Sequence, residues 1–116
     1  MVDDEPDITT VLKRGLEHHG FSVDVFNDPH AALVSFRPGH YDLMIIDIRM
    51  PKLNGFDLYR ELKKKDADVK VCFLTAFEIY YDEFRKMFPN IDVRAFIRKP
   101  ISISSLVSQV NATLES

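Results

Sequence analysis

Residues 42–55 read DLMIIDIRMPKLNG, and the part at 43–46 is an uninterrupted apolar run that leads directly to Asp47. A short run without polar alternation is typical of a strand that is covered on both faces, as in a parallel sheet. The turn that follows ends at Gly55, which we interpret as a backbone requirement rather than as chemistry. The stretch therefore predicts a buried strand with a carboxylate at its carboxyl end.

Similar short runs lie at 21–26, 69–74 and 94–97, and amphipathic segments separate them. Pro29 and Ser102 stand where two of these segments begin, as expected for helix starts. Alternating strands and helices predict an α/β fold, in which helices cover both faces of a parallel sheet. The apolar stripes of the expected helices are Ile8-Val11-Leu12-Leu16, Ala32-Leu33-Phe36, Phe56-Tyr59-Leu62, Tyr80-Phe84-Met87-Phe88 and Ile103-Leu106-Val107-Val110-Leu114.

Length and composition indicate one globular domain over residues 1–116. Hydrophobic residues make up 46% of the chain and charged residues 28%, which suits a single core. The net charge of −3 gives no bulk attraction to nucleic acid or anionic lipid. No apolar stretch approaches the roughly 20 residues that span a bilayer, and the single cysteine, Cys72, allows no internal disulfide. We therefore expect a cytoplasmic domain that binds neither nucleic acid nor membrane directly.

Three carboxylates stand at the expected strand ends. Asp3 and Asp4 follow the apolar pair Met1-Val2, and Asp47 follows the central run. Ligands of parallel α/β sheets bind beyond the carboxyl ends of the strands, so adjacent strands would bring these side chains together. Carboxylates that close repel one another, and Mg²⁺, which prefers oxygen ligands, relieves the repulsion. The sequence therefore predicts a magnesium site.

Two further residues are expected at the same edge. Thr75 directly follows the run at 69–74 and offers a hydroxyl. Lys99 follows the run at 94–97 and offers an ammonium group. A metal and a cation neutralise charge on transferring phosphoryl oxygens, and a carboxylate can act as the nucleophile. The set favours phosphoryl chemistry with Asp47 as the acceptor.

Four motifs that carry these residues resemble response regulator receiver domains of the CheY-like superfamily along nearly the whole chain. They are VDDE at 2–5, the stretch at 42–55, LTA at 74–76 and FIRKP at 96–100. The resemblance implies a flavodoxin-like (βα)5 three-layer sandwich with the parallel strand order 2-1-3-4-5.

The resemblance assigns the acidic residues to phosphorylation and metal binding. Asp47 corresponds to the phosphorylated aspartate. Asp3 and Asp4 correspond to the acidic pair that holds Mg²⁺, with Asp4 as the direct ligand, and Arg49 would supply its backbone carbonyl.

The resemblance assigns three other residues to the switch. Thr75 would bind a phosphoryl oxygen in the active state, and Lys99 would pair with the phosphoryl group or with the empty Asp47. Phe96 stands at the position of a rotameric aromatic switch, although it lacks the phenolic hydroxyl.

The implied function is that of a two-component response regulator receiver. A histidine kinase or phosphotransfer protein would donate the phosphoryl group to Asp47, and a conformational switch would control a partner or output domain. The partner would contact the face of the fourth helix, fifth strand and fifth helix, at about 78–88, 94–97 and 102–114. We expect a signalling domain rather than an enzyme, and homodimerisation stays open.

The first strand departs from the family pattern because only Met1 and Val2 precede the acidic pair. A typical strand has ~5–6 residues, so the strand is truncated. Two explanations stay open. The start of the sequence is mis-set or trimmed, or dimerisation or segment exchange compensates for the short strand. The segment 78–94 also lacks the common Gly-Ala turn and is rich in aromatic residues.

Two other function classes remain as alternatives. The first is a receiver-like interaction or dimerisation module that works without phosphorylation, which the altered first strand and fourth helix favour. The second is a Mg²⁺-dependent phosphatase, which needs an acid just after its nucleophile to protonate the leaving group. Arg49 stands two residues after Asp47, which disfavours the phosphatase.

Overall fold

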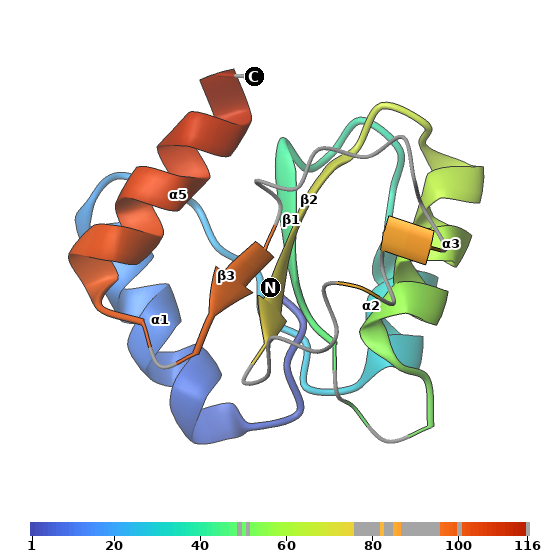
Figure 1. Ribbon diagram of the computed structural model, residues 1–116, viewed down its shortest axis with the longest axis horizontal. Coiled ribbons are helices and arrows are strands. Elements are labelled where there is room, and N and C mark those ends of the chain that lie inside the picture. The colour runs from blue at the N-terminus through green and yellow to red at the C-terminus, as the bar shows by residue number, and fades with distance from the viewer. Residues whose placement is uncertain are drawn as a thin grey trace.

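The computed structural model describes residues 1–48, 50, 52–75, 82, 85–86, 96–99 and 101–115. In this part of the chain a parallel sheet lies between two groups of helices, α1 and α5 on one face and α2 and α3 on the other (Figure 1). This arrangement confirms the α/β class with helices on both faces of a parallel sheet. The elements are α1 (Pro6–His18), α2 (Pro29–Ser35), β1 (Leu43–Asp47), α3 (Gly55–Lys65), β2 (Lys70–Thr75), β3 (Phe96–Arg98) and α5 (Ile103–Glu115).

The sheet has a continuous ladder of three parallel strands in the order β1-β2-β3. Asp47 pairs with Leu74, and Thr75 pairs with Arg98. The carboxyl ends of all three strands therefore point the same way, downward in Figure 1. The expected strands at 42–46 and 69–74 each lie one residue further along the chain, so Asp47 and Thr75 are the last residues of their strands.

The prediction of a strand at 21–26 was wrong in extent. Only Phe26 pairs, through an isolated parallel bridge to Val2, and Val2 forms a second bridge to Ile46. The two segments are nevertheless hydrogen-bonded: the Phe26 N–H donates to the Met1 carbonyl at 2.9 Å, and the Asp3 N–H donates to the Phe26 carbonyl at 3.1 Å. Val2 thus bridges Phe26 and β1.

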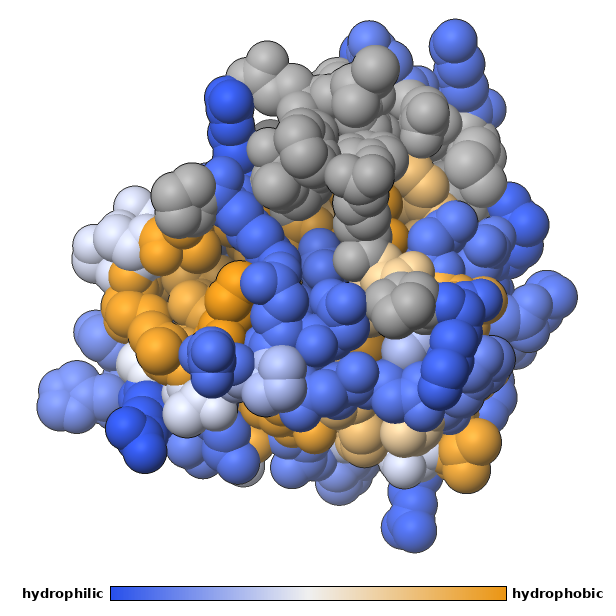
Figure 2. Space-filling model, turned by 90° about the horizontal axis from the view of Figure 1, so that it is seen from below, coloured by the Kyte–Doolittle hydropathy of each residue, from blue (hydrophilic) through white to orange (hydrophobic). Residues whose placement is uncertain are grey.

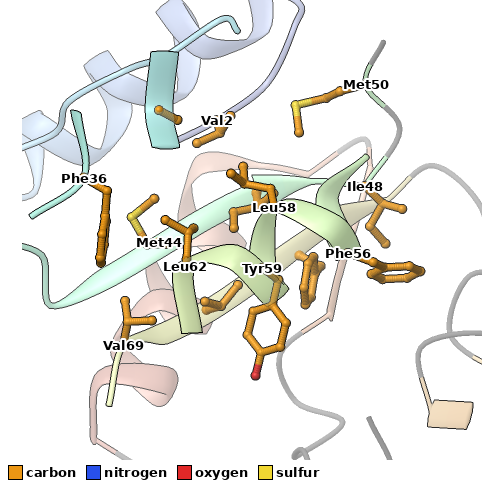
Figure 3. Packing of buried hydrophobic residues seen from close by; sticks show 14 residues of the cluster. Val2, Phe36, Met44, Ile48, Met50, Phe56, Leu58, Tyr59, Leu62 and Val69 are labelled. Atoms are coloured by element: carbon orange, nitrogen blue, oxygen red, sulfur yellow. The ribbon is translucent and has the colours of Figure 1, made fainter. Parts of the chain in front are cut away.

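Alternate residues of the strands enter two separate cores. Met44, Ile46 and Phe73 belong to the cluster under α2 and α3, whereas Ile45 and Cys72 belong to the cluster under α1 and α5. Successive side chains of a strand point to opposite faces, so an apolar run with no polar residues fills both cores. Side chains of α3, such as Leu58 and Leu62, lie over the sheet in the first of these clusters (Figure 3).

Side-chain caps set the starts of three helices. Asp28 accepts a hydrogen bond from the His30 N–H at 3.2 Å, and Asn54 accepts one from the Asp57 N–H at 2.9 Å. Ser102 Oγ accepts a hydrogen bond from the Ser105 N–H at 3.2 Å, which confirms Ser102 as the expected cap of α5. Among the helices that the structure describes, none combines the length and apolar character needed to cross a membrane.

Candidate functional site

Asp47 is held firmly at the carboxyl end of β1. Its backbone N–H donates to the Val2 carbonyl at 2.8 Å, and the residue is 4% exposed. The Gly55 N–H donates to the Ile48 carbonyl at 2.8 Å. A Cβ atom at Gly55 would overlap the Asp47 carbonyl oxygen and would lie 2.7 Å from the Ile48 Cα. Glycine is therefore required because the start of α3 packs directly against the backbone that carries Asp47.

Asp3 is fully buried and is held mainly by side-chain hydrogen bonds. Its Oδ1 accepts from the Glu5 N–H at 3.0 Å, and its Oδ2 accepts from Lys99 Nζ at 2.8 Å. Asn27 Nδ2 donates to the Asp3 carbonyl at 2.8 Å. A buried carboxylate without such partners would be costly, so these contacts fix the position of Asp3.

Lys99 joins the two carboxylate-bearing segments. Its Nζ lies 2.8 Å from Asp3 Oδ2, 3.5 Å from Asp47 Oδ1 and 3.5 Å from Glu5 Oε1, and the side chain is 15% exposed. Burial by itself would lower the pKa of this ammonium. The hydrogen bond that Lys99 donates to Asp3 and the charges of Asp47, Asp3 and Glu5 outweigh burial and raise the pKa above its usual value. Lys99 is therefore a fixed positive charge beside Asp47 at neutral pH.

The acidic residues meet as expected and form one cluster. One carboxylate oxygen from each of Asp3, Asp4, Glu5 and Asp47 lies within 4.8 Å of the others. All are hard oxygen donors, which is the ligand type that Mg²⁺ prefers. One ammonium, that of Lys99, contacts three of these four carboxylates. The donor set fits a divalent cation, both in chemistry and in charge.

Glu5 is the member of the cluster to which the sequence analysis gave no role. It directly follows Asp3 and Asp4, so the run of three acids was the available signal. The spacing could not place it, because Glu5 is also where α1 begins and an acid there is common for helix capping.

The remaining predicted residues lie at the same edge or outside the described part. Thr75 ends β2 beside Arg98 of β3, and its side chain lies outside the described part of the chain. Phe96 begins β3 and is half-buried, with its ring centroid 5.5 Å from that of Phe73. Arg49 and most of the segment 78–94 are outside the described residues.

The edge with the carboxyl ends of the strands is a largely hydrophilic surface. The strands point downward in Figure 1, and Figure 2 shows the molecule from below, so it shows the face toward which the strands point. The centre of this face is mostly hydrophilic, and an apolar patch lies to one side. A cavity of about 370 Å³ lies near the amino end of β1 instead, with Phe21, Tyr41, Leu43 and Val110 in its lining. The cavity shares no residue with the acidic cluster, so it is separate from the candidate site.

Comparison with known families gives a match to the sequence pattern described as "Response regulator receiver domain", which covers residues 1–111. Among curated proteins, the chain is similar to the response regulator SaeR of Staphylococcus aureus (strain USA300). The two are 31% identical over 114 residues, which is 98% of this chain and 49% of SaeR. The chain thus spans about half the length of this relative.

Solved structures with the same fold include receiver domains. The non-phosphorylated HemR receiver domain from Leptospira biflexa has a TM-score of 0.83 and 26% identity, over 99% of this chain and 91% of that one. The response regulator protein TrrA from Thermotoga maritima, in complex with Mg²⁺-BeF, has a TM-score of 0.78 and 32% identity. That match covers 97% of this chain and 94% of TrrA.

Proposed function

The chain belongs to the response regulator receiver domain family, and from this premise we propose that Asp47 accepts a phosphoryl group from a phosphohistidine. The donor would be a histidine kinase or a phosphotransfer protein. One observation carries the proposal: Asp47 shares the Lys99 ammonium with the buried Asp3 inside a cluster of four carboxylates. We propose that residues 1–116 act as one receiver domain.

The proposed reaction transfers one phosphoryl group between two side chains. An oxygen of the Asp47 carboxylate attacks the phosphorus, a P–O bond forms, and the P–N bond of the phosphohistidine breaks. The imidazole leaves with the electron pair of that bond, and Asp47 becomes an acyl phosphate. Lys99 supplies a positive charge to the phosphoryl oxygens and needs no proton transfer to do so.

We assign Mg²⁺ binding to the carboxylates of Asp3, Asp4 and Asp47, together with the backbone carbonyl of Arg49. When bound, Mg²⁺ would neutralise charge on the transferring oxygens. Asp4 is half-buried, whereas both oxygens of Asp3 already accept hydrogen bonds. This difference supports Asp4 as the direct ligand and Asp3 as the residue that holds Lys99.

The proposed switch connects the phosphoryl group to Phe96. Thr75 would contact a phosphoryl oxygen from the end of β2, and Phe96 would then change its ring position. Phe96 starts the strand next to β2, and its ring contacts Phe73 in the core under α3. A half-buried ring on a packed neighbour can adopt a more or a less buried position, which is what such a switch needs.

The face of β3 and α5 is the proposed partner surface among the described residues. From Ile103 to Leu114, α5 contains no charged residue, whereas 28% of the whole chain is charged. Cores of protein interfaces are depleted in charged residues, which supports a contact surface here. The exposed residues of α5 up to Leu114 are Ser104, Ser105, Ser108, Gln109, Asn111 and Ala112, and the exposed charged residues Arg98 of β3 and Glu115 of α5 lie outside this stretch.

Intact-mass measurement tests the function most directly. Incubation with acetyl phosphate and Mg²⁺ should add one phosphoryl mass to the chain, and both EDTA and Asp47→Asn should abolish the addition. Asp42→Asn is the matched control, because this acid precedes β1 and lies outside the cluster. It should be phosphorylated like the parent chain. A parent chain that stays unmodified would favour the phosphorylation-independent module.

NMR spectroscopy tests the switch separately. Addition of Mg²⁺ and beryllium fluoride should shift the amide signals of Phe96–Arg98 and of α5 in addition to those around Asp47. Shifts confined to the residues around Asp47 would contradict transmission to the partner surface.

A further inference from the structure

Glu5 directly precedes α1 without serving as its side-chain cap. The residue is the N-cap, and its carbonyl accepts hydrogen bonds from the N–H groups of Ile8 and Thr9, both at 3.1 Å. Within the described part of the chain, its carboxylate makes no capping hydrogen bond. The usual structural reason for an acid at this position therefore does not apply, although Asp28 and Asn54 do cap their helices with side chains.

The Glu5 carboxylate points instead to Lys99. Glu5 Oε1 lies 3.5 Å from Lys99 Nζ, and its side chain is 56% exposed. Asp3 contacts the same ammonium from the buried side, with its side chain fully buried. A lysine ammonium has three N–H donors, and Asp3, Asp47 and Glu5 lie around this one.

We propose that Glu5 is a positioning residue of the phosphoacceptor site, which holds Lys99 from the solvent side and adds negative charge beside the metal position. The inference rests on the proposed function, since it concerns the same site. Asp3 fixes Lys99 from the interior, and Glu5 limits its movement toward solvent, so the ammonium stays beside Asp47 while no phosphoryl group is present.

The charge of Glu5 has opposite effects on the two ligands of the site. A carboxylate whose oxygen lies within 4.8 Å of those of Asp3, Asp4 and Asp47 attracts a divalent cation. The same charge repels an anionic phosphodonor and competes with it for Lys99. Glu5 therefore strengthens metal binding at the expense of the approach of the anion.

Titration with Mg²⁺ alone tests the proposal in the full chain. Isothermal titration calorimetry of Glu5→Gln, which keeps the shape of the side chain but removes its charge, should show Mg²⁺ affinity reduced by about three- to tenfold at low salt. With Mg²⁺ at saturation, Glu5→Gln should react faster than the parent chain with acetyl phosphate. Asp7→Asn is the matched control: Asp7 is an exposed acid in the same first turn, outside the cluster, and its variant should change affinity by less than about twofold.

A metal-free measurement reports on Lys99 itself. The ¹⁵Nζ signal of Lys99 should broaden in Glu5→Gln, because a less restrained ammonium exchanges its protons with water faster, and it should remain unchanged in Asp7→Asn. Glu5→Asp, which keeps the charge, should recover most of the Mg²⁺ affinity. If Glu5 served only to start α1, then Glu5→Gln, Glu5→Asp and Asp7→Asn would not differ in their Mg²⁺ affinity.

Several results would overturn the inference. They are a Mg²⁺ affinity of Glu5→Gln within about twofold of the parent chain, an equal loss in Asp7→Asn, or an equal loss in Glu5→Asp. The proposed function fails separately, if the parent chain binds Mg²⁺ with the expected dependence on Glu5 but is never phosphorylated on Asp47.

Discussion

The two segments that carry the carboxylates are supported in different ways. Asp47 ends a five-residue strand that is in register with β2, and the start of α3 packs against its backbone. Asp3 and Asp4 follow Val2, which has only isolated bridges to Phe26 and Ile46. Asp3 is held by one backbone hydrogen bond, from its N–H to the Phe26 carbonyl, and by contacts with Lys99, Asn27 and the Glu5 N–H.

This difference divides the site into two halves. The rigid half is Asp47 with β1, and the lightly supported half is the acidic pair Asp3 and Asp4 with the bridging segments around Val2 and Phe26. A continuous ladder fixes the backbone through many cooperative contacts, whereas the acidic pair depends on a few individual hydrogen bonds. Local opening should therefore start at residues 1–5 and 21–26, and the metal should stabilise this half more than the other. The five predictions that follow test this difference.

The largest effect is expected on the rigid half from Gly55→Ala. The added methyl group would overlap the Asp47 carbonyl, and backbone cannot yield as a flexible side chain can. We expect a loss of about 3 kcal/mol in the free energy of unfolding, measured by chemical denaturation. Gly39→Ala, where the new Cβ meets nothing within 4 Å but φ is +76°, should cost only about 1 kcal/mol. Equal losses would contradict the close-approach explanation.

The second-largest effect is expected from Mg²⁺, which should stabilise the folded chain because its proposed ligands come from both halves. At a free concentration about 100 times its Kd, a ligand that binds only the folded state adds about 2.7 kcal/mol to the free energy of unfolding. Thermal melts should show this gain in the parent chain and a much smaller one in Asp47→Asn.

Hydrogen exchange locates the same effect. Below saturation, Mg²⁺ should slow exchange of the Val2 and Asp3 amides more than that of the Cys72 amide, since Cys72 already lies in the ladder. Uniform slowing across the sheet would mean that the two halves open together.

Asn27→Ala should weaken the lightly supported half by a smaller amount. It removes hydrogen bonds to the Asp3 carbonyl and to Thr9 Oγ1, so we expect a loss of about 1–2 kcal/mol in unfolding free energy and weaker Mg²⁺ binding. Asn54→Ala removes the cap of α3 and should cost about 1 kcal/mol without changing Mg²⁺ affinity. Loss of metal binding in both variants would refute the specific role of Asn27.

The smallest effect concerns Tyr41, whose hydroxyl donates to Asp24 Oδ2 at 2.7 Å next to the bridging segment. Burial, and then the hydrogen bond and charge of Asp24, raise the pKa of Tyr41 to about 12 from a usual value of 10.0. The folded state favours the protonated phenol, so its contribution to stability is complete below pH 10 and is lost as the pH rises toward 12. Tyrosinate absorbance, with Tyr41→Phe as the reference, should show a lower pKa for Tyr41 in Asp24→Asn. An unchanged pKa would remove Asp24 as a cause.

The sequence predicted the chemistry of the site better than the support behind it. The apolar run before Asp47 indicated a strand covered on both faces, and the motifs around Asp3, Asp4 and Lys99 indicated residues that the structure brings together. The strand at 21–26 was overestimated, because a local apolar pattern does not show which of its residues will pair with a neighbouring segment. Glu5 was missed for a related reason, since an acid before a helix has an ordinary capping role until its side-chain direction is known.

By itself, the sequence determined the α/β class, the alternation of elements and the residues that end the strands, because these follow from periodicity and from residue chemistry along the chain. Tertiary structure alone decided which neighbours each group received: the sharing of Lys99 among Asp3, Glu5 and Asp47, the close approach at Gly55 and the bridges of Val2 to Phe26 and Ile46. These features depend on distances between residues that are up to 96 positions apart, and such distances are fixed only when the packed sheet and helices set them together.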